Sequence, residues 1–136
     1  MPLDEAPKLV SMMGAIERAV VAELYARLSA AGFGGLSPES ALIFQFVRPG
    51  GSTVDELARL AQASADAVLE QVRRLAAEGY VEGSERVSLT ARGRAAAEVG
   101  LRAIDEIEAG WRRELGDEAF AGLVAALARL NLRPVA

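Results

Sequence analysis

The side chains that most often carry catalysis or bind metals in proteins are missing from this chain of 136 residues. It has no cysteine and no histidine, so it offers no thiolate nucleophile and no imidazole base, and a zinc site would have only carboxylates. The carboxylate pairs 55–56 and 105–106 are adjacent on predicted helices and therefore point apart. The sequence shows no phosphate-binding loop, nucleophile constellation or metal-ligand set. We predict that the protein is not an enzyme and uses no cofactor or metal.

The hydrogen-bonding side chains best placed to contact a ligand come later in the sequence. Gln71, Arg73 and Arg74 follow one another closely, and Arg86 comes a little further on. An amide both donates and accepts hydrogen bonds, and a guanidinium group donates to phosphate or to other paired acceptors. What these groups can bind depends on the elements that position them.

Two short helices are predicted on either side of residues 62–63. Ser52 or Thr53 would cap the first and Ser64 the second, and Gly79 suits the left-handed position after the second. The inward-facing positions recur at helical spacing and are Val54, Leu57, Ala58, Ala61, Val68, Val72 and Leu75. Two helices joined by so short a turn indicate a helix-turn-helix.

A β-hairpin is predicted directly after these helices. The stretches 80–82 and 86–89 have the composition of strands, and the Gly-Ser pair at 83–84 forms a turn between them. An apolar helix that begins at the Ser-Pro-Glu stretch 37–39 would supply the core of this part of the chain. We therefore predict a winged helix-turn-helix lobe over residues 36–89.

Long helices are predicted at both ends of a single domain that covers residues 1–136. The helix at 8–31 is apolar on more than one face, and a helix of this kind must be covered on more than one side. In so short a chain a partner subunit would supply that cover, so 8–31 is a predicted dimerisation helix. The fold class is mainly α with a small β-wing.

The lobe resembles the multiple antibiotic resistance regulator (MarR) family in three motifs. Residues 53–58 read Thr-Val-Asp-Glu-Leu-Ala, which is similar to the start of that family's helix-turn-helix. Residues 75–81 read Leu-Ala-Ala-Glu-Gly-Tyr-Val, which is similar to the end of its recognition helix. Residues 87–94 read Val-Ser-Leu-Thr-Ala-Arg-Gly-Arg, which is similar to the phrase after its wing.

The resemblance implies a homodimer that binds double-stranded DNA and regulates transcription. In such a dimer 8–31 and 90–131 are the dimerisation helices. The second short helix would enter the major groove, and the wing would reach the minor groove. The residues implied to lie at the DNA are Ser64, Asp66, Ala67, Gln71, Arg73, Arg74, Ser84 and Arg86. The resemblance also implies a small aromatic or anionic effector, for which the candidate contacts are Phe44, Arg48 and Trp111. Packing in the dimer core is the alternative role for Trp111.

The charge of the chain favours an alternative function. Lys and Arg number 15 against 19 Asp and Glu, which gives a net charge of −4. The wing is short, and the recognition helix carries Asp66 and Glu70 where phosphates would repel carboxylates. The alternative is a winged-helix dimer that has lost DNA binding and serves as a protein-interaction or ligand-binding module. The acidic start of the chain and the lack of a long apolar stretch predict no secretory signal and no membrane span, and therefore a cytoplasmic protein.

Overall fold

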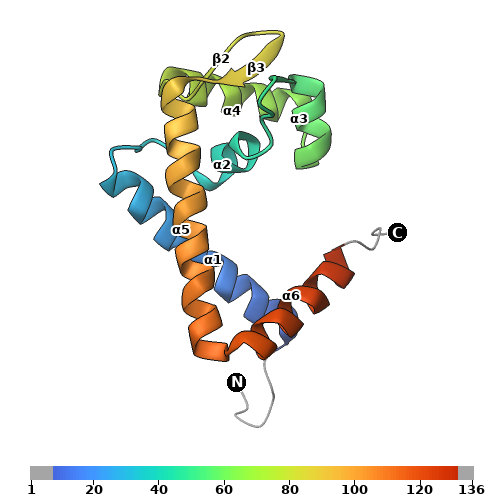
Figure 1. Ribbon diagram of the computed structural model, residues 1–136. Helices are drawn as coiled ribbons and strands as arrows, with labels where there is room; N and C mark the ends of the chain where they lie inside the picture. Colours follow the sequence, from blue (N-terminus) through green and yellow to red (C-terminus); the bar gives the residue numbers. More distant parts are fainter. Residues whose placement is uncertain (1–7, 132–136) are drawn as a thin grey trace. The chain divides into compact units, whose positions relative to one another are not determined.

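The computed structural model describes residues 8–131, which fall into two compact units. The first unit reaches Leu101 and the second begins at Arg102, so α5 runs from one into the other. The elements in chain order are α1 (Leu9–Ala30), α2 (Pro38–Phe44), β1 (Ser52–Thr53), α3 (Val54–Ala61), α4 (Ala65–Ala77), β2 (Val81–Glu82), β3 (Arg86–Leu89), α5 (Ala91–Leu115) and α6 (Asp117–Asn131). Figure 1 shows this mainly helical fold with its small sheet.

Helices α2, α3 and α4 each begin after a serine or threonine cap. Ser37 caps α2 through a reciprocal pair of hydrogen bonds with Ser40, and Pro38 occupies the first turn. Thr53 rather than Ser52 caps α3, since its hydroxyl oxygen accepts from the backbone N–H of Glu56 at 3.1 Å. Each cap satisfies a backbone donor that has no partner within its helix.

The sheet of the first unit has three strands, one more than the sequence predicted. Its order is β1-β3-β2, and both pairings are antiparallel. The predicted hairpin is the β2–β3 pair, with Val81 opposite Leu89. The added strand β1 pairs Ser52 with Val87 and leads directly into α3. The sheet thus ties the wing to the start of the helix-turn-helix.

The core of the first unit lies between α2, α4 and the sheet. Its most buried members are Ile43, Leu57, Val68, Leu75, Tyr80, Val81, Val87 and Ala96 of α5. The side chain of Tyr80 is fully buried and meets the ring of Phe44 edge to face, with the ring centroids 6.1 Å apart. All the predicted inward-facing positions of α3 and α4 are buried or packed against this core. The predicted winged helix-turn-helix is therefore confirmed.

The first helix keeps much of its apolar surface exposed. Along α1 only Leu28 is buried, while Leu24 and Tyr25 pack against the core. The large apolar side chains that remain exposed are Leu9, Val10, Met12, Met13 and Ile16. The exposed apolar side chains are those expected if a partner subunit covers α1, as the sequence predicts.

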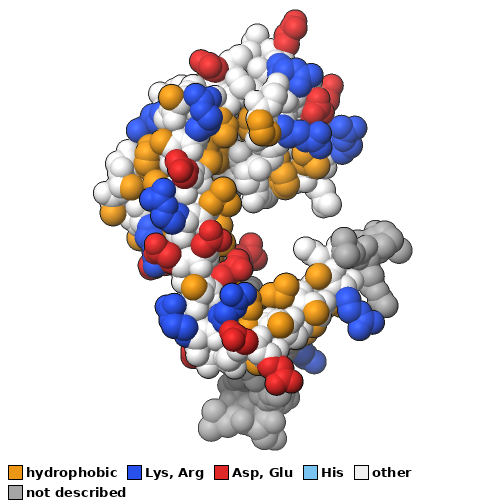
Figure 2. Space-filling view, viewed as in Figure 1, with side chains coloured by type: hydrophobic (Ala, Val, Ile, Leu, Met, Phe, Trp, Pro, Cys, Tyr) orange, Lys and Arg blue, Asp and Glu red, His pale blue; other side chains and the backbone are white. Residues whose placement is uncertain are grey.

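The second unit is a helical hairpin. Gly116 takes a left-handed conformation, with φ 89°, between the end of α5 and the start of α6. The guanidinium group of Arg112 lies over the ring of Phe120, 4.7 Å from its centroid. The large apolar side chains exposed on α6 are Leu123, Val124, Leu127 and Leu130. Figure 2 shows apolar side chains gathered along this helix.

Candidate nucleic-acid interface

A tight turn fixes the angle between α3 and α4. Gln62 ends α3 in the left-handed region, with φ 54° and ψ 46°, and Ala63 N–H donates to the Ala58 carbonyl. Ser64 then caps α4, because its hydroxyl oxygen accepts from the N–H of Ala67 at 3.1 Å. This cap occupies the Ser64 side chain within the helix, while Ala67 presents an exposed methyl group.

The α4 helix has a buried face and an outward face of opposite character. Val68, Val72 and Leu75 are buried in the core. Asp66, Glu70, Arg73 and Arg74 are all exposed and recur at intervals of three and four residues, which places them on one face. Four of the predicted contact residues of α4 therefore remain accessible: Asp66, Ala67, Arg73 and Arg74.

Charges on this outward face change sign along the helix. Asp66 lies in the first turn and Arg74 in the last, which is the arrangement that the helix dipole favours. Arg74 also pairs with Glu70, with 3.2 Å between a guanidinium nitrogen and a carboxylate oxygen. Because both side chains are more than 60% exposed (63% and 62%), this pair adds little stability and is free to rearrange.

Gln71 is placed differently from the other predicted contacts. Its side-chain oxygen is buried and has no hydrogen-bond partner among residues 8–131. The residue as a whole is half-buried, on the edge of the outward face. Burying a hydrogen-bond acceptor without a donor costs free energy, so a rearrangement that gives the Gln71 side-chain oxygen a donor would be favourable.

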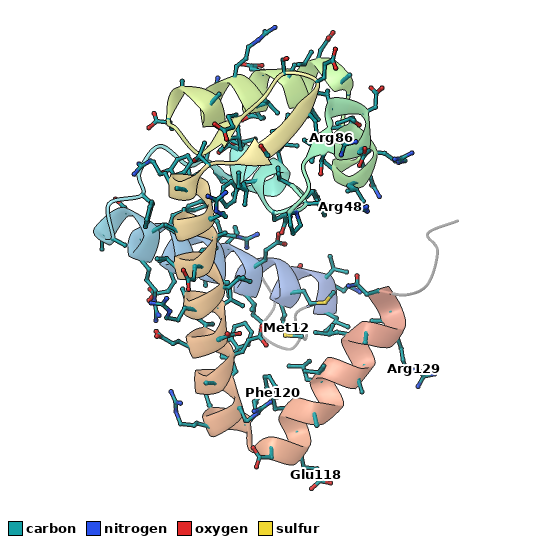
Figure 3. The ribbon with its side chains drawn as sticks, turned by 45° about the horizontal axis from the view of Figure 1, so that its top comes forward. Met12, Arg48, Arg86, Glu118, Phe120 and Arg129 are labelled. Atoms are coloured by element: carbon teal, nitrogen blue, oxygen red, sulfur yellow. The ribbon has the colours of Figure 1, made fainter. Side chains whose placement is uncertain are left out.

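The wing is a minimal hairpin. Gly83 takes φ 95°, and a side chain there would overlap the carbonyl oxygen of Arg86, so the turn requires glycine. Ser84 lies exposed in the turn. The Arg86 side chain crosses Gly51 and donates to its carbonyl oxygen at 3.0 Å. Figure 3 shows Arg86 and Arg48 on the same side of the lobe, beside α3.

Arg92 holds the end of α4, the wing and the α1–α2 connection together, a role that the sequence did not suggest. Its guanidinium group donates to the carbonyls of Glu78 and Gly32, at 3.0 and 3.3 Å, and to the Tyr80 hydroxyl. It lies 4.7 Å from the Tyr80 ring centroid. The Tyr80 hydroxyl donates in turn to the Gly34 carbonyl. Burial raises the pKa of Tyr80, which opposes the effect of Arg92 and keeps the hydroxyl protonated as a donor.

The three candidate effector contacts belong to different parts of the chain. Phe44 is half-buried against Tyr80, and Arg48 is exposed, with its backbone N–H donating to the Ser52 hydroxyl. Trp111 is half-buried in the second unit. A shared site for these three residues stays a prediction.

Positive and negative side chains alternate over the lobe. Between residues 52 and 94 there are six arginines and seven carboxylates. Figure 2 shows basic and acidic side chains interspersed on the visible face of this part, with no continuous basic strip.

No cluster of side chains suited to a metal ion occurs in the part of the chain that the structure describes. None of the helices in residues 8–131 combines the length and apolar character needed to cross a membrane.

Three features define the winged helix-turn-helix class: two short helices joined by a tight turn, a second helix with an exposed face, and an adjacent β-wing. No family model matches the sequence, and no curated protein sequence does so either. Solved structures do match. A MarR family protein of Mycobacterium tuberculosis, Rv2887, in complex with DNA is 26% identical, with 93% of this chain and 98% of that chain covered and a TM-score of 0.71.

The MarR protein of E. coli, in its reduced form, shares the fold more than the sequence. It is 19% identical, with 95% of this chain and 97% of that chain covered and a TM-score of 0.74. M. tuberculosis RV1404 is 17% identical, with 99% of this chain and 100% of that chain covered and a TM-score of 0.69. The chain therefore has the winged-helix fold of these MarR proteins.

Proposed function

We propose that this chain is a MarR-like transcriptional regulator that binds double-stranded DNA as a homodimer. The observation that carries the proposal is the α3–α4 pair, whose second helix keeps a polar outward face free beside a β-wing. A similar protein was solved with DNA, and its likeness extends over 93% of this chain. We also propose that the protein is cytoplasmic and has no enzymatic activity. Among the similar structures, one is a MarR family protein in complex with DNA and another is the transcriptional regulator PA4135.

The homodimer is supported by the exposed apolar side chains of the long helices. Val10 of α1 is 74% exposed and Leu130 of α6 is 55% exposed, and each belongs to a run of exposed apolar residues. Apolar surface of this extent is rare on monomers and is typical of subunit interfaces. A two-fold dimer would present two copies of α4 about one DNA turn apart.

Control by a small aromatic or anionic effector is a further part of the proposal. The candidate contacts are the half-buried rings of Phe44 and Trp111 and the exposed Arg48. Aromatic rings and a guanidinium group suit an aromatic anion. Isothermal titration with salicylate, a small aromatic anion, tests this part. Binding that is lost in Arg48→Ala supports it, and no heat of binding contradicts it for this ligand class.

The second candidate is a winged-helix dimer without DNA binding. The observations that favour it are the Asp66 and Glu70 carboxylates on α4 and the bond from Arg86 to Gly51, which holds the wing arginine against the lobe. A phosphate backbone repels carboxylates, and each lost arginine contact weakens binding.

A gel shift separates the two candidates. The probe is promoter DNA that flanks the protein's own gene, tested at about 50 and about 150 mM salt, because phosphate contacts weaken as salt rises. The first candidate predicts retardation at the lower salt and weaker retardation by Arg86→Ala. If no probe is retarded at the lower salt while the protein remains dimeric, the second candidate is correct.

A further inference from the structure

The outward face of α4 carries an unusual combination of groups for a helix that enters the major groove. Glu70 offers carboxylate acceptors, and Arg74, one turn later, offers guanidinium donors in contact with it at 3.2 Å. Asp66 adds a second carboxylate one turn before Glu70 and has no ion-pair partner among the described residues. The first half of this face therefore accepts hydrogen bonds and the second half donates them.

The four bases differ in how they would meet a carboxylate. In the major groove cytosine presents the N4 amino donor, while guanine and thymine present O6, N7 or O4 acceptors. Adenine has an N6 donor, but its N7 acceptor lies beside it. A carboxylate held at the base edges is thus satisfied by cytosine and faces a repulsive acceptor at the other bases.

Arginine has the complementary preference. Its paired donors match the O6 and N7 acceptors of guanine, which is the commonest specific contact in protein–DNA complexes. A C·G base pair presents the cytosine donor and the guanine acceptors side by side. The Glu70–Arg74 pair presents an acceptor and donors in the same arrangement, and both side chains are exposed enough to separate onto the two bases.

Resting on the proposed function, we propose that the Glu70–Arg74 pair selects a C·G base pair in each half-site of the operator. The Glu70 carboxylate accepts from cytosine N4 and the Arg74 guanidinium donates to guanine. This assignment explains how a lobe with seven carboxylates and six arginines over residues 52–94 binds its site. The carboxylate raises specificity by penalising every other base at that position, at the cost of weak non-specific binding.

The neighbouring residues support close approach of this face to the bases. Ala65 and Ala67, in the first turn of α4, are exposed and have the smallest side chains after glycine. Short side chains there let the Glu70 side chain reach a base edge without steric obstruction. The Ser64 cap keeps the first turn helical, because its hydroxyl already accepts from the N–H of Ala67.

The test is a selection of binding sites from random duplex DNA, performed at low salt on three proteins. They are the wild type, Glu70→Gln and the control Glu118→Gln, which makes the same change on α6, outside the lobe (Figure 3). Glutamine pairs with N6 and N7 of adenine, so Glu70→Gln should change one half-site position from C·G to A·T. Competition binding should show a preference of about 10- to 100-fold at that position in each protein.

Each outcome of this selection is decisive. A C·G position in sites selected by the wild type and by Glu118→Gln, converted to A·T by Glu70→Gln, supports the inference. Identical sites from all three proteins overturn the inference and leave the proposed function standing. If the wild type and Glu118→Gln are both folded and dimeric but the wild type enriches no sites at low salt, the proposed function itself fails. The base preference then fails with it.

Discussion

Gly93 should be the least replaceable residue at the junction of the wing and α5. It is buried in the first turn of α5, and a Cβ atom placed there would overlap the carbonyl oxygen of Tyr80 and lie 3.4 Å from the Cβ of Leu89. The Tyr80 carbonyl cannot withdraw easily, because it accepts from the Thr90 N–H at 3.0 Å and its side chain is fully buried. Gly93→Ala must therefore move backbone.

The cost of Gly93→Ala can be worked from these contacts. Forcing a methyl group into a packed site costs about 3 kcal/mol. Loss of the hydrogen bond to the Tyr80 carbonyl adds about 1 kcal/mol. The higher helix propensity of alanine returns about 1 kcal/mol. We expect a net loss of about 3 kcal/mol in the free energy of unfolding, a large share of the ~5–15 kcal/mol of an ordinary domain.

Urea unfolding followed by circular dichroism measures this loss, at one fixed subunit concentration because a dimer's stability depends on it. The matched control is Gly100→Ala in the same helix, where the added Cβ would lie 3.8 Å from Leu24 Cδ1, an ordinary contact. That control should be unchanged or more stable by up to about 1 kcal/mol. Equal stability of the two variants would refute the steric reasoning.

The remaining predictions concern the hydrogen bonds of Arg92 to Gly32, Glu78 and Tyr80 (the Arg92 clamp), stability at alkaline pH and the proposed dimer. Arg92→Ala removes three hydrogen bonds and should destabilise the protein by about 2 kcal/mol in the same urea assay, whereas no change would show that the clamp is unimportant. Burial raises the pKa of Tyr80 above 10.0, so the unfolded chain loses the Tyr80 proton at lower pH than the folded protein does. The free energy of unfolding should therefore fall as pH rises above 10.0, and less steeply in Tyr80→Phe. The same fall with pH in both proteins would contradict this role of Tyr80. Ile16→Glu should convert the proposed dimer to monomer in light scattering, while Leu60→Glu, on α3, should not. A dimeric Ile16→Glu would exclude α1 from the interface.

Local features of the fold could be predicted because their signals lie within a few residues. A helix start at 37–39, a cap at Ser52 or Thr53, a cap at Ser64 and a left-handed Gly79 were predicted. The structure has Ser37, Thr53 and Ser64 as caps and Gly79 in the left-handed region. A cap depends on one side chain and the backbone three residues later, so the sequence contains the whole interaction. The inward face of α4 was predicted for the same reason, since its helical spacing is visible in the sequence.

Features that depend on distant residues could not be predicted. The strand β1 has two residues, too few for any alternation pattern, and exists because β3 pairs with it. Helix α2 starts at the predicted Ser-Pro-Glu stretch but ends at Phe44, before turns that lead into β1, and no pattern in the sequence predicts this early end. Arg92 reaches the Gly32 carbonyl across 60 residues, and nothing in the sequence around either residue indicates that contact.

The candidate DNA contacts show both kinds of result. Asp66, Arg73 and Arg74 lie on the exposed face that the helical period predicts. The half-burial of Gln71 and the bond from Arg86 to Gly51 depend on how the helix and the wing pack against the rest of the lobe. The contacts of these residues with DNA remain predictions.

The most direct measurement is fluorescence anisotropy of a labelled duplex from the protein's own promoter, titrated with protein across a salt series. If α4 and the wing bind DNA, the duplex binds at about 50 mM salt, and the affinity falls at least about tenfold by about 200 mM, as expected for one phosphate contact in each subunit of a dimer. An anisotropy that never rises at the lowest salt, from protein shown to be folded and dimeric, would contradict the proposed function.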